Sequence, residues 1–208
     1  MDWSVQYARA SEKRPNERYV SMGRRSIQVS QDIKDPYFPL LTSTTDLSLY
    51  TRLNELTEEF QDQYEEDLNA KLGFSMPLSD NGKSILKYGY RLRTKTKVRA
   101  NSFFQYAPIG TMAANFANIS LLKLTNHSDP GFYAGSKYKA GNFVDAGYLG
   151  SINFKDAASF KETDAPAEYL AGNFSAKETI QAGYLQLNQE FTDKLSMVAG
   201  VRLENTSL

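Results

Sequence analysis

The sequence predicts an all-β fold, an antiparallel transmembrane β-barrel segment of about five strands with two long extracellular loops. Two observations lead to this prediction. Several stretches alternate between apolar and polar residues with a period of two, as strands with two different faces do. The connections between these stretches alternate between short turns and very long segments. Compact soluble domains rarely carry such long loops, whereas outer-membrane barrels do so routinely.

The clearest alternation lies in the predicted strand at residues 85–99. Its even positions include Tyr88, Tyr90 and Leu92, and its odd positions are basic from residue 87 onward, with Gly89 as the one exception. The basic residues are Lys87, Arg91, Arg93, Lys95, Lys97 and Arg99. A helix would spread these cations around its whole circumference, so the pattern predicts a strand with one cationic face.

A second strand is predicted at residues 64–76, immediately before the basic one. Its apolar face consists of Leu68, Ala70, Leu72, Phe74 and Met76. The sequence Asp-Asn-Gly at residues 80–82 then favours a tight turn, because Asn and Gly tolerate a positive φ. We therefore predict an antiparallel hairpin with Phe74 and Tyr88 facing outward and Arg91 and Arg93 facing inward.

Three further strands complete the predicted set. Residues 177–191 and 195–206 alternate on either side of a short turn at residues 192–194, which predicts a second hairpin. Residues 2–10 place Trp3, Val5 and Tyr7 on one side of a fifth strand. The remaining segments, residues 11–63 and 100–176, are predicted to be the two long loops. The acidic run at residues 55–67, which begins near the end of the first loop, is interpreted as a solvated helix face.

The last hairpin resembles a known family. The stretch "AKETIQAGYLQLNQEFTDKLSMVAGVRLENT", residues 176–206, is similar to the barrel of TonB-dependent outer-membrane receptors, as is the hairpin at residues 66–99; "ASEKRPNER" resembles a loop entry in their Bacteroidota-type members. The resemblance implies location in the cell outer membrane and energised import of a scarce nutrient such as a siderophore or a glycan. It also implies outer-membrane lipid and the TonB complex as partners. The family has a plug domain, and the sequence contains none, so we expect the chain to be an internal part of a receptor.

The sequence predicts binding rather than catalysis. His127 is the sole histidine, and it lies in a predicted loop that offers a catalytic triad no fixed geometry. We therefore predict that the protein is not an enzyme and has no catalytic residue, metal site or cofactor. The residues predicted to face a ligand of unknown identity are Lys87, Arg91, Arg93, Lys95, Tyr133 and Tyr138. Acidic residues on neighbouring strands, such as Glu190 and Glu204, are an alternative explanation for the cations, because ion pairing would make them structural.

Two other functional classes remain open at this stage. A passive porin-like barrel would share the hairpins but would need neither a plug nor energy coupling. A soluble β-rich binding module would instead use the cationic strand to bind an anionic polymer. Nucleic acid is not predicted as a partner, because 24 basic residues balance 24 acidic ones across the chain.

Overall fold

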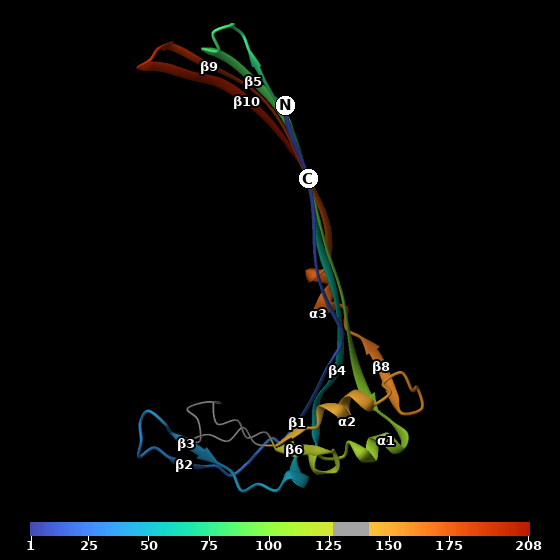
Figure 1. Cartoon of the computed structure of the whole chain (residues 1–208). Helices are drawn as coiled ribbons and strands as arrows, with labels where there is room; N and C mark the ends of the chain where they lie inside the picture. The colour runs from blue at the N-terminus through green and yellow to red at the C-terminus, as the bar shows by residue number, and fades with distance from the viewer. Residues whose placement is uncertain (127–141) are drawn as a thin grey trace. The chain divides into compact units, whose positions relative to one another are not determined.

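The computed structural model describes residues 1–126 and 142–208, and most of the chain is antiparallel β-sheet (Figure 1). The prediction of an all-β fold is therefore confirmed. Strands form at all five predicted places. They are β1 (Asp2–Gly23), β4 (Arg52–Pro77), β5 (Ser84–Pro108), β9 (Phe174–Thr192) and β10 (Leu195–Ser207).

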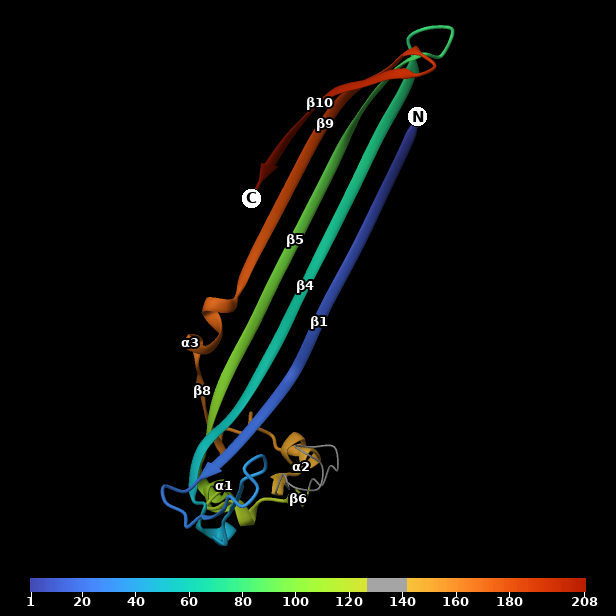
Figure 2. The same cartoon turned by 90° about the vertical axis from the view of Figure 1, so that its left-hand side faces the viewer.

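These five strands belong to one sheet with the order β1-β4-β5-β9-β10, and Figure 2 shows the strands lying side by side in that order. Along β5 and β9 the register is regular from Ser84 opposite Gln189 to Arg99 opposite Phe174. The pairing of β9 with β10 is equally regular beyond Ser196. The pairs β4–β5 and β9–β10 are consecutive in the chain, whereas a long connection separates β1 from β4 and another separates β5 from β9.

The predicted hairpin of residues 67–76 and 85–99 is confirmed. Strands β4 and β5 are neighbours, and the backbone N–H of Leu78 donates to the carbonyl oxygen of Ser84 at 2.8 Å across the turn. Gly82 has a φ of 70°, the left-handed conformation that favours glycine. The side chain of Asn81 accepts a hydrogen bond from the backbone of Lys83 at 3.0 Å.

The strands extend well beyond their predicted ends. β1 continues to Gly23 rather than residue 10, β4 begins at Arg52 rather than residue 64, and β5 continues to Pro108 rather than residue 99. The acidic run at residues 55–67 is therefore strand, and its interpretation as a helix face is wrong. The extension of β1 is largely polar. The extensions of β4 and β5 carry core residues such as Leu56 and Tyr106, but their apolar residues follow no regular period of two. Cross-strand pairs such as Lys13 with Asp62, 3.1 Å apart, also link the strands.

The residues form two compact units. The sheet unit consists of residues 1–14, 61–101 and 170–208, and the loop unit consists of residues 15–60 and 102–169. In the loop unit, β8 (Phe160–Asp164) pairs with the end of β5, and two small ladders form, β2 (Ser30–Asp32) with β3 (Leu40–Thr42) and β6 (Leu124–Asn126) with β7 (Asn142–Val144). Short helices connect them: η1 (Leu47–Leu49), α1 (Gly110–Asn115), η2 (Ile119–Leu121), α2 (Ala146–Ser151) and α3 (Pro166–Tyr169). η4 (Leu170–Gly172) belongs to the sheet unit.

A hydrophobic core lies in the loop unit. It gathers side chains from β4, β5, β8 and the connecting segments: Leu56, Tyr106, Phe116, Leu122, Ile152, Phe154 and Phe160. Phe154 is the most deeply buried of them, and its ring stacks on Tyr106 with centroids 4.6 Å apart. Described residues of the second predicted loop thus pack into a hydrophobic core, to which Leu56 of the first predicted loop also contributes.

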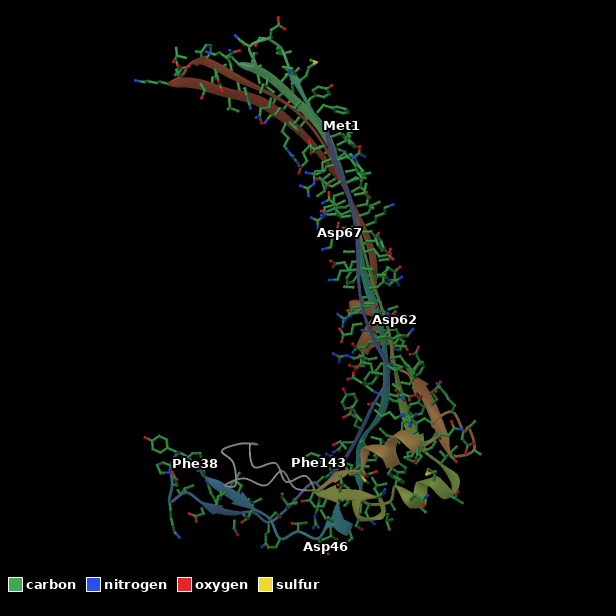
Figure 3. The ribbon with its side chains drawn as sticks, viewed as in Figure 1. Met1, Phe38, Asp46, Asp62, Asp67 and Phe143 are labelled. Atoms are coloured by element: carbon green, nitrogen blue, oxygen red, sulfur yellow. The ribbon has the colours of Figure 1, made fainter. Side chains whose placement is uncertain are left out.

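The sheet unit is a single layer, and its side chains project from both faces (Figure 3). Every residue of β10 is exposed, and so are large apolar side chains on the other strands. Trp3 is 67% exposed and Val201 is also 67% exposed. Among the helices that the structure describes, none is long and apolar enough to cross a membrane.

Candidate functional site

The alternation along β5 gives the sheet unit two chemically different faces. We call the face that carries the odd residues 87–99 of β5 the basic face, and the opposite one the apolar face. Because register partners point to the same side, the basic face continues onto the even residues of β9 and β10. For example, Arg91 lies opposite Ala182, which in turn lies opposite Glu204.

Gly89 interrupts the row of cations for a steric reason. A Cβ atom at this position would lie 2.5 Å from the carbonyl oxygen of Leu72 and 2.7 Å from Cε1 of Tyr184. Tyr184 is the register partner of Gly89 on β9, so its ring covers the glycine on the basic face. The one exception in the sequence pattern therefore marks the point where an aromatic ring crosses β5.

Carboxylates and an amide of β4 hold several cations of the basic face. Nε of Arg93 donates to both carboxylate oxygens of Asp67 at 3.1 and 3.0 Å, and Nζ of Lys95 lies 2.7 Å from Oε1 of Glu65. Nε of Arg91 donates to the amide oxygen of Asn69 at 3.1 Å. Ion pairing thus accounts for the presence of Arg93 and Lys95 on the basic face. Their acidic partners lie on β4, and Glu190 and Glu204 are not among them.

Glu204 instead pairs with Arg202, two residues away on the same strand. Together with Arg91 and Arg93, this pair surrounds a cavity of about 160 Å³ whose other lining residues are Ile180 and Ala182. Lys87 and Lys95 do not line it. Arg202 was missed as a candidate because the resemblance to the receptors marks its Gly-x-Arg-x-Glu motif only as a strand signature.

The apolar face carries a continuous band across the sheet. Three rows run in register across β5, β9 and β10. They are Leu86–Leu187–Ala199, Tyr88–Leu185–Val201 and Tyr90–Gly183–Leu203. Phe74 of β4 extends the band, since its ring stacks on Tyr88 at 5.2 Å. On β4 and β10 the band spans about nine residues, from Leu68 to Met76 and from Leu195 to Leu203, the length that a tilted strand needs to cross a bilayer.

The loop unit has a separate cavity of about 520 Å³ between β4, β5 and α3. Its lining includes the carboxylates Glu55 and Glu168, the amide of Gln105 and the ring of Phe103, and it contains no basic residue. This cavity therefore suits a neutral or cationic molecule rather than an anion. The predicted ligand-facing residues Tyr133 and Tyr138, and also His127, lie outside the described residues.

A network of buried charged and polar groups lies beside the aromatic core. Nε of Arg18 donates to Glu58 at 2.7 Å, and its Nη1 donates to the carbonyl oxygens of Leu149, Gly150 and Ile152 at the end of α2. The guanidinium also lies 4.5 Å from the ring centre of Phe154. Arg18 thus fixes the end of a helix, which is a structural role.

The hydroxyl of Tyr106 continues this network to the surface. It donates to Glu162 at 3.0 Å and lies 3.3 Å from Glu58. Burial of the ring, followed by the hydrogen bond to the Glu162 carboxylate, raises the pKa of Tyr106 far above its ordinary value. In turn, the hydrogen bond from Lys155 holds the pKa of Glu162 below its ordinary value of 4.5.

We expect this last interaction to make the loop unit less stable in acid. Because the folded-state pKa of Glu162 is lowered, its stabilisation is complete above the unfolded-state pKa of about 4.5 and is lost as the pH falls through the folded-state value. Lys155→Met should raise the pKa of Glu162 in an NMR titration of its carboxyl carbon. Lys161→Met, a neighbouring change of the same type, is the control. An equal shift in the two variants would contradict the assignment of Lys155 as the main cause.

Comparisons with family models, with curated proteins and with solved structures each find no match.

Proposed function

We propose that this chain forms part of the barrel wall of a TonB-dependent outer-membrane receptor, which imports a scarce nutrient such as a siderophore or a glycan. In this proposal the apolar face contacts outer-membrane lipid and the basic face lines the interior. The two long connections are then the extracellular loops that meet the nutrient. Energy for import comes from the TonB complex.

The observation that carries the proposal is the apolar band of the sheet unit. A single-layer sheet in water would leave this band exposed, and a soluble sheet normally buries such a face against a second layer. Strands with lipid-facing and lumen-facing residues in alternation are typical of outer-membrane barrels. The aligned rows through Tyr88 and Tyr90 match this arrangement, as do the ion-paired cations on the opposite face.

The arrangement of the connections supports the same proposal. The turns at residues 78–83 and 193–194 are short, whereas the segments between β1 and β4 and between β5 and β9 are long. Outer-membrane barrels place short turns in the periplasm and long loops outside the cell. The aromatic core of the loop unit gives the proposed surface region a fixed structure.

Cell fractionation and surface proteolysis test the proposal in a host that produces the full-length protein. We expect the protein in the outer-membrane fraction. When protease is added to intact cells, we expect it to cut the protein within residues 24–51 but not at residues 78–83. Recovery in the soluble fraction would contradict membrane insertion and favour a soluble binding module. If the protein is in the outer membrane but nutrient uptake persists after the proton gradient is collapsed, the passive porin-like alternative is favoured instead.

A further inference from the structure

The cavity of about 160 Å³ on the basic face brings together three arginines from two strands that are not neighbours. Arg91 and Arg93 come from β5 and Arg202 from β10, and β9 lies between them. The intervening residue Ala182 is only 3% exposed, and its methyl group is too short to reach the level of the guanidinium groups. Ala182 lies in register between Arg91 of β5 and Glu204 of β10, so this small residue leaves a depression that is lined by the three arginines and one glutamate.

The charges around this cavity do not cancel. Arg93 is neutralised by Asp67, and Arg202 by Glu204. Arg91 donates to Asn69, a neutral amide, and among the described residues no carboxylate lies within ion-pair distance of it. Counting the residues that line the cavity and their direct ion-pair partners, three arginines and two carboxylates leave one net positive charge, which Arg91 contributes.

The existing hydrogen bonds orient these arginines without using all of their donors. A guanidinium has five N–H donors in a fixed plane. Arg91 uses Nε, Arg93 uses Nε and Nη2, and Arg202 uses Nη2. The remaining N–H groups are available to a further acceptor, and the partners already hold the side chains in place, which lowers the entropic cost of binding.

From this geometry we propose that Arg91, Arg93 and Arg202 form a binding site for a single oxyanion, the carboxylate or phosphate group of a small molecule. Oxyanions accept paired hydrogen bonds from guanidinium groups, and these charge-assisted bonds are stronger than neutral ones. A singly charged oxyanion would also neutralise the net charge of the site. The inference deepens the proposed function, on which it rests for the location of the site inside a barrel.

Titration calorimetry of the full chain in detergent micelles, with inorganic phosphate and with acetate as the two probes, tests this site. We expect saturable binding of one anion per chain that weakens as sodium chloride is added. The probe that binds more tightly identifies the group as phosphate or carboxylate. Absence of saturable binding of both probes at low salt would overturn the proposal.

Matched variants distinguish a defined site from general attraction to a basic surface. Arg91→Gln and Arg202→Gln should each weaken binding at least about tenfold, because each removes charge-assisted hydrogen bonds. Ala182→Leu should weaken it similarly by filling the cavity without changing any charge. Lys97→Gln removes a cation from the same face of β5 outside the cavity, and should change affinity by less than about twofold.

Circular dichroism confirms that each variant retains its sheet before titration. Equal losses in Arg91→Gln and Lys97→Gln, or full affinity in Ala182→Leu, would overturn the site. Binding is measured in detergent micelles, so failure to bind the probes is independent of whether the protein lies in the outer membrane. A chain that binds phosphate but is recovered in the soluble fraction would contradict the proposed function while leaving the oxyanion site intact.

Discussion

Under the proposed function, Leu185→Arg is expected to destabilise the protein in a membrane by about 2 to 4 kcal/mol, the cost of placing a cation near the bilayer midplane on the lipid face of a barrel. Leu185 lies in the middle of the apolar band, with Tyr88 opposite it on β5 and Val201 opposite it on β10. Its side chain is 48% exposed in the structure, so in water the arginine would meet no steric barrier. The measurement is reversible unfolding by denaturant in lipid vesicles.

The control introduces the same cation one residue further along. Gln186→Arg places it on the basic face, opposite Lys87 and Gly200. If this face lines a water-filled interior, as proposed, it tolerates the cation, and we expect a change of less than about 1 kcal/mol. Equal destabilisation by the two variants would show that the apolar face does not contact lipid and would remove the main support for the proposed function.

Phe154→Ala should destabilise the loop unit by about 3 to 5 kcal/mol, the usual cost of removing a buried phenylalanine ring. The ring is 2% exposed and contacts Tyr106, Phe160 and the guanidinium of Arg18. Its loss leaves a void at the centre of the core and removes the surface against which Arg18 is held. Amide hydrogen exchange should therefore become faster at Tyr106 and in α2.

Phe143→Ala is the matched control, because it removes the same ring from an exposed position in β7, labelled in Figure 3. Phe143 is 46% exposed, and we expect its substitution to cost less than about 1 kcal/mol. Unchanged exchange at Tyr106 in Phe154→Ala would mean that the aromatic cluster does not stabilise this unit.

Periodic sequence patterns were the most reliable source of structural prediction. Both hairpins of the sheet unit were predicted, because alternation between faces and a turn with Asn81 and Gly82 are local properties of the chain. The loop unit was not predicted. Its core joins Leu56, Tyr106 and Phe154, residues far apart in the chain with no common period, so their meeting depends on tertiary packing.

The candidate site shows the same division. The alternation from Lys87 to Arg99 already specifies a strand with one cationic face, because side chains of a strand alternate with a period of two whatever surrounds them. The partner of each cation depends on the register between strands, which pairs Arg93 with Asp67 and leaves Arg91 on a neutral amide. Arg202, more than 100 residues away in the sequence, joins these arginines only because β9 places β5 and β10 on either side of Ala182.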